Sequence, residues 1–137
     1  MGIRDVPAQL RRQVIERAQE HCEYCHMPDR LSFYSPEIDP IVARKHGGVT
    51  VLDNLARACW RCNHNKGSDL SSFDPLSGEL TRLFNPRTDV WEEHFRIEDS
   101  HLVSDTPLGR TTISLLRLNE TERMTERALA IGLGQYS

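Results

Sequence analysis

The chain has 137 residues, which is enough for one domain of ordinary size and too few for two with full cores. Its formal net charge of −3 excludes a protein that coats nucleic acid through bulk positive charge, so a nucleic-acid site has to be a local patch. No stretch approaches the roughly eighteen consecutive apolar residues of a membrane span, and residues 1–7 lack the apolar run of a signal peptide. We therefore expect a soluble, cytoplasmic protein with one domain over residues 1–137 and no membrane partner.

An amphipathic helix is predicted over residues 7–20. Pro7 suits the first turn of a helix, because its missing N–H is not needed there. Leu10, Val14 and Ala18 then recur at four-residue intervals, which places them on one face. This face is expected to pack against the rest of the domain.

The cysteines form two pairs with the same spacing, Cys22-Glu-Tyr-Cys25 and Cys59-Trp-Arg-Cys62. Two residues between ligands let each pair point both sulfurs at one ion, and two pairs complete a tetrahedron. Buried thiols without a metal would not need this spacing, and a redox dithiol would need only one pair. We therefore predict one structural zinc ion per chain, which holds the fold and leaves no coordination position for chemistry.

Residues 21–70 are otherwise expected to hold short elements, judged from their turn residues and apolar runs. These are two extended segments within 31–45 around Pro36 and Pro40, a turn at 47–48, a helical turn or loop at 53–55, a strand at 56–58, and a helix at 60–66 that ends at Gly67.

Residues 71–137 contain further turn-forming residues between apolar segments, and we predict that they form an extension of the domain. The expected elements are turns at 74–78 and 85–86, a short helix at 89–94, a hairpin from 95–97 and 102–103, a helix from 106 to about 118, and a helix from 121 to about 130. With few strands and several helices, the predicted class is α+β.

Several motifs in the middle of the chain resemble those of HNH endonucleases. They are Asp39, Lys45-His46-Gly47-Gly48, Asp53-Asn54-Leu55 and Cys59-x-x-Cys62-Asn63-x-x-Lys66-Gly67. Further segments look like the extension of a small bacterial HNH subfamily found often in cyanobacteria: Glu79-Leu80, residues 83–87, residues 91–95 and residues 106–110. The resemblance covers residues from about 20 to 130 and implies a ββα-metal (HNH, His-Me finger) core stapled by the four-cysteine zinc site, with an N-terminal helix and a C-terminal hairpin-plus-helices extension.

The resemblance also implies roles for four residues and a reaction. Asp39 and Asn63 would hold a catalytic Mg²⁺ or Mn²⁺ ion, which prefers oxygen ligands and retains most of its waters. Asn54 would orient the loop or the base, and Lys66, three residues after Asn63 on a helix, would meet the phosphate or the developing charge. The implied reaction is hydrolysis of DNA phosphodiester bonds to 5′-phosphate and 3′-hydroxyl ends.

Pro40 stands where the family carries the histidine that acts as general base. Proline cannot accept a proton, and loss of a positioned base typically lowers the rate by about 10²- to 10⁴-fold. Three explanations remain: an inactive domain that still binds DNA or protein, another base such as His46 or His64, or hydrolysis without a side-chain base. Neither histidine is a convincing substitute, because His46 belongs to the family's usual turn and His64 should point about 100° away from Asn63.

Basic residues concentrate between positions 41 and 70. The cations are Arg44, Lys45, Arg57, Arg61 and Lys66, against the two anions Asp53 and Asp69. This local excess predicts a salt-sensitive contact with DNA of modest affinity. Trp60 can stack on a base, but beside a zinc knuckle it is expected to pack. The last two helices close the core or form a face for a homodimer or another protein partner.

Overall fold

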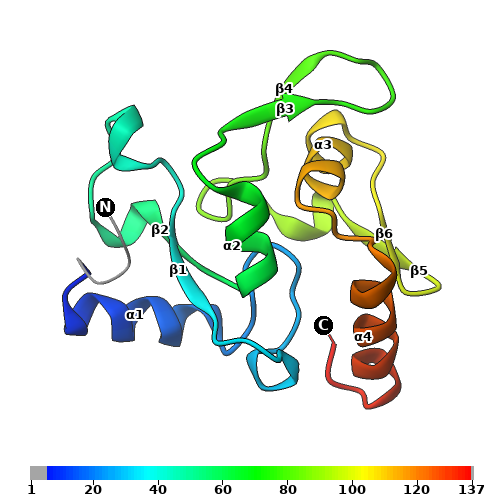
Figure 1. Cartoon of the computed structure of the whole chain (residues 1–137), viewed down its shortest axis with the longest axis horizontal. Helices are drawn as coiled ribbons and strands as arrows, with labels where there is room; N and C mark the ends of the chain where they lie inside the picture. Colours follow the sequence, from blue (N-terminus) through cyan, green and yellow to red (C-terminus); the bar gives the residue numbers. More distant parts are fainter. Residues whose placement is uncertain (1–5, 137) are drawn as a thin grey trace. The chain divides into compact units, whose positions relative to one another are not determined.

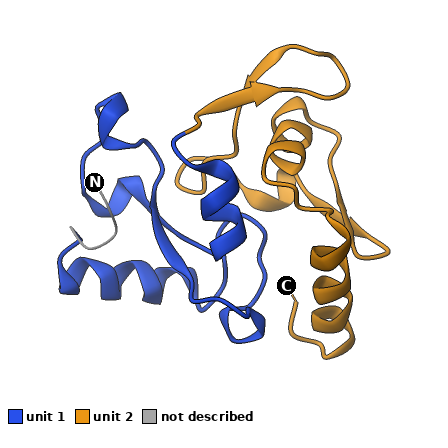
Figure 2. Ribbon diagram, viewed as in Figure 1, with its two compact units in different colours: residues 1–68 blue, residues 69–137 orange. Residues whose placement is uncertain are grey.

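The computed structural model describes residues 6–136 (Figure 1). The chain divides into two compact units, unit 1 (Met1–Ser68) and unit 2 (Asp69–Ser137) (Figure 2). Both units combine helices with two-stranded antiparallel sheets, which confirms the α+β class. No helix in the described part of the chain is long and apolar enough to cross a membrane. The single domain expected from the chain length stays a prediction.

The described part of unit 1, residues 6–68, contains two helices, one hairpin and three single turns of 3₁₀ helix. In chain order they are α1 (Ala8–Ala18), η2 (Asp29–Leu31), β1 (Glu37–Pro40), η3 (Arg44–His46), η4 (Leu52–Asn54), β2 (Leu55–Ala58) and α2 (Trp60–Lys66). The predicted helix at 60–66 is therefore confirmed, and the predicted strand at 56–58 begins one residue earlier.

The β1–β2 hairpin places different side chains on its two faces. The strands are antiparallel, with Ile38 opposite Arg57 and Asp39 opposite Ala56. Because side chains alternate along a strand, Ile38 and Asp39 point to opposite faces. Ile38 packs in the core that includes Val14 of α1, whereas Asp39 turns toward α2. Asp39 thus faces α2, and the pocket that it lines also reaches the core residues Ile38 and Leu55.

Helix α1 confirms the predicted amphipathic helix. Val14 is completely buried and Leu10 is partly buried against the core, as their four-residue spacing predicted. The guanidinium of Arg17 donates to the carbonyl oxygens of Leu52 and Leu55, which ties the end of α1 to the start of β2. The helix ends at Gln19, whose backbone is left-handed.

The prediction of two extended segments within residues 31–45 is only half right. One strand forms, Glu37–Pro40, and no second strand is present in that segment. The chain leaves β1 after Pro40, and the next part of the segment forms the 3₁₀ turn η3 (Arg44–His46). The apolar pattern did not show which part of the segment would find a strand partner.

Within residues 69–136, unit 2 contains two hairpins, two helices and one turn of 3₁₀ helix. Its elements are β3 (Ser71–Phe73), β4 (Leu80–Arg82), η5 (Trp91–Glu93), β5 (Arg96–Glu98), β6 (His101–Val103), α3 (Pro107–Leu115) and α4 (Thr121–Gly132). The second hairpin and both helices follow the prediction, with α3 shorter and α4 longer by a few residues. The β3–β4 hairpin was not predicted, since only its turn at 74–78 carried a signal.

Candidate functional site

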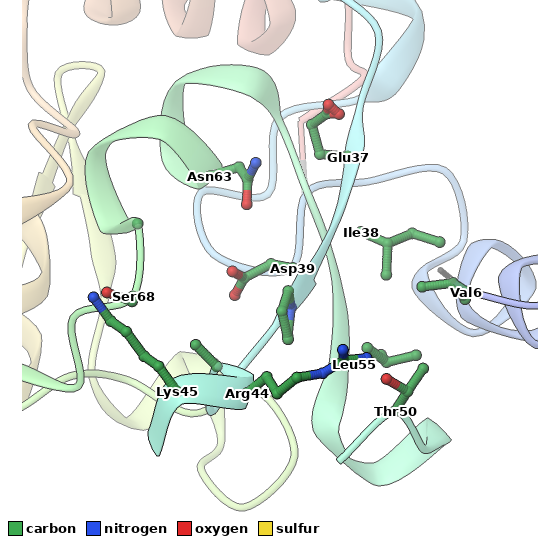
Figure 3. A pocket seen from close by; sticks show the side chains of 13 residues that line it. Val6, Glu37, Ile38, Asp39, Arg44, Lys45, Thr50, Leu55, Asn63 and Ser68 are labelled. Atoms are coloured by element: carbon green, nitrogen blue, oxygen red, sulfur yellow. The ribbon is translucent and has the colours of Figure 1, made fainter. Parts of the chain in front are cut away.

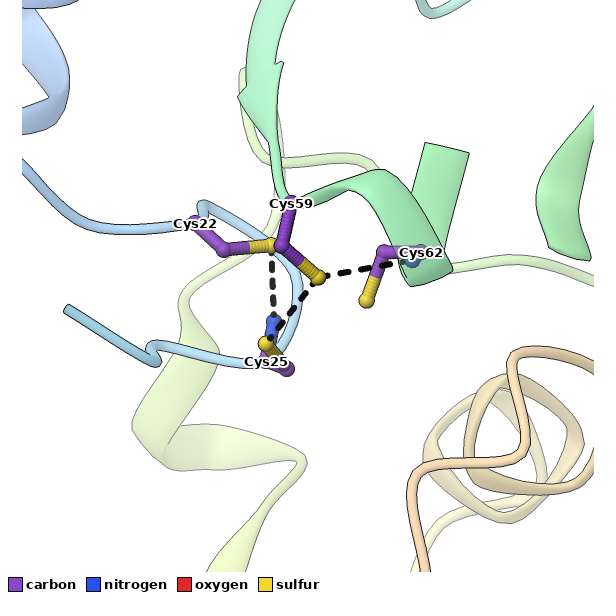
Figure 4. A group of neighbouring side chains, drawn as sticks. All are labelled: Cys22, Cys25, Cys59 and Cys62. Carbon is purple, nitrogen blue, oxygen red and sulfur yellow. Dashed lines mark hydrogen bonds between the residues drawn. The ribbon is translucent and has the colours of Figure 1, made fainter. Parts of the chain in front are cut away.

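The four cysteines meet in one buried cluster. Figure 4 shows the side chains converging from the 22–25 turn, the end of β2 and the first turn of α2. One sulfur from each cysteine lies within 4.8 Å of all the others. Burial raises the pKa of the Cys22 and Cys62 thiols well above the usual range, so their thiolates need a neighbouring cation. Four buried thiols in this arrangement fit the donor set of a tetrahedral Zn²⁺ site.

The cluster is also part of the local backbone structure. The sulfur of Cys22 accepts hydrogen bonds from the N–H groups of Tyr24 and Cys25, and the sulfur of Cys59 accepts one from Cys62 at the start of α2, each at 3.4 Å. The two cysteine turns, Cys22–Cys25 and Cys59–Cys62, which we call the first and second knuckle, therefore fix the residues next to them. Tyr24 lies inside the first knuckle, and Asn63 directly follows the second.

Asp39 is held in place by two donors from different elements. The residue is 1% exposed, and its Oδ2 accepts a 2.7 Å hydrogen bond from Tyr24 Oη. The Lys66 ammonium lies 3.1 Å from the same oxygen and donates to the carbonyl of Ile41, also at 3.1 Å. Burial raises the pKa of the Asp39 carboxyl, although the neighbouring Lys66 and Tyr24 act in the opposite direction.

The predicted metal ligands Asp39 and Asn63 line the same pocket, which has a volume of about 440 Å³. Figure 3 shows the Asn63 amide, on α2, facing the strand that carries Glu37 and Asp39. The Asn63 side chain makes no hydrogen bond to another described residue, so its amide oxygen is available. A carboxylate and an amide oxygen in one pocket fit the donor set of Mg²⁺ or Mn²⁺.

Asn54 holds the loop between β1 and β2. Its side-chain Oδ1 accepts from the backbone N–H of Val42, and its Nδ2 donates to the carbonyls of Val42 and Val49, all within 2.9–3.0 Å. Gly48 lies against the same loop, where an added Cβ would come within 1.7 Å of the Val42 carbonyl oxygen. Of the two predicted roles, orienting the loop is the one that these contacts support.

The pocket wall at the general-base position is Pro40, and none of the described pocket residues is a histidine. His46 is exposed on η3, and it does not line the pocket in the described structure. His64 is exposed as well and stacks on Trp60, with ring centroids 5.1 Å apart. The geometry therefore gives no support to either histidine as a substitute base.

The five predicted nucleic-acid-binding cations have different surroundings. Arg44 and Lys45 are exposed and line the pocket. Arg57 donates to Asp29 at 2.8 Å, and Lys66 is buried against Asp39, so these two cations face carboxylates of the protein itself. Arg61, on α2, is partly exposed and is not among the described pocket residues. The basic segment consequently offers fewer charges to a phosphate backbone than its composition indicates.

Two residues of the site were missed in the sequence. Glu37 lines the pocket beside Asp39, because residues two apart on a strand share a face. That signal was present once β1 was placed. Tyr24 carried no comparable signal, since its hydrogen bond to Asp39 joins residues far apart in the chain.

Comparison with known proteins agrees with this geometry. The family model described as HNH endonuclease matches residues 22–69, which hold both the cysteine cluster and the pocket residues of β1 and α2. The chain is 27% identical over 122 residues to Septu protein PtuB from Bacillus thuringiensis, covering 87% of this chain and 44% of that protein. It therefore spans less than half the length of this curated relative. No solved structure gave a significant match.

The HNH endonuclease model thus covers the four-cysteine cluster, the β1–β2 hairpin and the α2 helix that follows it. A nuclease-type function is what the match to this family model suggests. Residues 22–69 of the chain are therefore similar to the HNH endonuclease domain.

Proposed function

We propose that the protein is a metal-dependent endonuclease that hydrolyses DNA phosphodiester bonds at the pocket between β1 and α2. The observation that carries the proposal is the meeting of Asp39 and Asn63 in one pocket, within a segment that matches the HNH family model. When bound by these two residues, Mg²⁺ or Mn²⁺ would polarise the phosphodiester and stabilise the leaving 3′ oxygen.

The chain's own residues prepare this site before substrate arrives. Tyr24 and Lys66 hold the Asp39 carboxylate at a fixed position on the pocket wall. Asn54 fixes the loop that leads to Arg44 and Lys45, and these cations are placed to attract the phosphate backbone to the pocket. Fixing the groups in advance lowers the cost of organising them around the substrate.

Proton transfer is the step for which the pocket lacks the family's usual group. Pro40 has no atom that accepts a proton from the attacking water, so hydrolysis by this chain is expected to be slow. This observation favours a second function, an HNH-fold module that binds DNA or a protein without cutting. The two functions share the pocket and differ in turnover.

Supercoiled-plasmid nicking in manganese distinguishes the two functions. The chain is compared with Pro40→His, and with Asn63→Ala as the control for contaminating nuclease. We expect slow nicking by the chain, loss of nicking in Asn63→Ala, and a rate higher by roughly 10²- to 10⁴-fold in Pro40→His. A silent chain with an active Pro40→His variant supports the binding module, and two silent proteins contradict the nuclease proposal.

A further inference from the structure

Four aromatic rings form a continuous row on the surface of unit 1, which we call the aromatic row: Phe33, Tyr34, Trp60 and His64. Phe33 meets Tyr34 edge-on, with ring centroids 5.2 Å apart. Tyr34 lies 4.8 Å from Trp60 at an angle of 32°, and Trp60 stacks on His64 at 5.1 Å and 7°. The row joins the segment before β1 to helix α2.

The aromatic row does little for the core of the protein. Phe33 is 90% exposed, Tyr34 is 48% exposed and Trp60 is 40% exposed. Trp60 therefore packs against other rings, as expected beside a zinc knuckle, but it does not enter the core. An exposed phenylalanine gains almost nothing from burial in the free protein, and a group of exposed aromatic rings is typical of a binding surface.

We propose that the aromatic row is a stacking platform for unpaired bases of the nucleic-acid strand that enters the pocket. Helix α2 carries both features, because Trp60 and His64 are one turn apart and Asn63, three residues after Trp60, is a neighbour of Trp60 on the helix surface. A strand with a phosphate at Asn63 can therefore lay its neighbouring bases on the row. This inference rests on the proposed function and names its substrate as a strand that is unpaired beside the reacting phosphate.

The charge of unit 1 favours stacking over binding by phosphates alone. Arg57 and Lys66 pair with internal carboxylates, which leaves Arg44 and Lys45 as the exposed cations that line the pocket. Stacking supplies affinity that does not depend on charge, and every base has a face that an aromatic ring can cover. Bases inside a duplex are already stacked on each other, so the platform distinguishes unpaired strands from duplex DNA.

Fluorescence anisotropy tests the proposal with three probes of equal length: labelled oligothymidylate, the same backbone without bases, and a duplex. No divalent cation is added, so binding is measured without cutting. We expect oligothymidylate to bind at least tenfold more tightly than the base-free strand or the duplex. Phe33→Ala should weaken its binding by roughly five- to a hundredfold, the usual effect of removing one stacking ring.

Two substitutions separate ring stacking from general apolar contact. Phe33→Tyr should retain the affinity, whereas Phe33→Leu should behave like Phe33→Ala, because leucine keeps the apolar surface and loses the flat face. Phe73→Ala serves as a matched control, since Phe73 is also largely exposed (63%) and belongs to unit 2. It is expected to bind like the unchanged chain.

The emission of Trp60 shows where the strand lies. The chain has two tryptophans, so Trp91→Phe leaves Trp60 as the sole reporter, and oligothymidylate should quench it. Equal affinity for the base-free strand, or unchanged binding in Phe33→Leu, overturns the proposal. If the chain does not nick plasmid but still binds oligothymidylate through the row, the stacking platform is supported and the nuclease proposal fails.

Discussion

At the scale of single residues, the pocket depends on one buried ion pair. Asp39 and Lys66 are both almost fully buried, and their partners within the protein are the Tyr24 hydroxyl and the Ile41 carbonyl. A buried charge is tolerated only while it is paired, so neither member can be removed alone without a large cost. The same pairing keeps the Asp39 carboxylate on the pocket wall, as the proposed metal site requires.

Lys66→Met is expected to destabilise the protein by about 3–5 kcal/mol at neutral pH, because it leaves the Asp39 carboxylate buried with one donor. The double variant Asp39→Asn/Lys66→Met should be more stable than Lys66→Met, as it removes both charges. Urea denaturation of the three proteins measures these differences.

The pH dependence of the same variant follows from the raised pKa of Asp39. A carboxyl whose pKa is higher in the folded protein favours folding at low pH, and this contribution is lost as pH rises through the folded pKa. The loss of unfolding free energy caused by Lys66→Met should therefore become smaller as the pH is lowered. A deficit that is constant with pH would show that the carboxylate charge is not its cause.

At the scale of elements, Asp74 explains the hairpin that was not predicted. Its carboxylate accepts from the Leu76 N–H, the Ser77 hydroxyl and the Arg110 guanidinium, all within 3.0 Å. Its backbone N–H also donates to the Glu79 carbonyl. These contacts close the loop between β3 and β4 and fasten it to α3, whereas the short strands themselves have no clear alternation.

Asp74 should make the stability of unit 2 sensitive to acid. The Arg110 hydrogen bonds hold the pKa of the Asp74 carboxyl well below its usual range, so its contribution is present above a pH of about 4 and lost as the pH falls further. In a Trp60→Phe background, Trp91 emission reports unit 2 during unfolding. Asp74→Asn is expected to lower the stability of unit 2 at neutral pH and to reduce the loss of stability as the pH falls. A loss as steep as in the unchanged chain would contradict the role of Asp74.

At the scale of the whole molecule, each unit has buried apolar residues of its own. Unit 1 has the core around Val14 and Leu55 together with the cysteine cluster, and unit 2 has buried leucines such as Leu102 and Leu116. Structural zinc sites contribute directly to folding free energy, so a chelator should act on the unit that contains the cysteines.

Chelation is expected to unfold unit 1 and leave unit 2 folded. Trp60 and Trp91 report the two units separately when the other tryptophan is replaced by phenylalanine. We expect a chelator to change the emission of Trp60 at concentrations that leave Trp91 unaffected, and metal analysis should find one zinc per chain beforehand. Simultaneous change of both signals would instead support the single domain expected from the chain length.

The sequence by itself determined the features that depend on spacing along the chain. The two cysteine pairs, the face of α1 and the limits of α2 follow from intervals of two to four residues, which local geometry converts directly into structure. The family motifs likewise placed Asp39 and Asn63 in one pocket.

Only the tertiary structure decided which residues that are far apart in the sequence contact one another. Tyr24 donates to Asp39, Lys66 and Arg57 are paired with internal carboxylates, and Trp60 joins the aromatic row. A residue's local pattern is the same whether its charge faces solvent or a buried partner. Burial and pairing depend on segments that meet only after folding, and these decide how much charge and aromatic surface remains exposed on the protein.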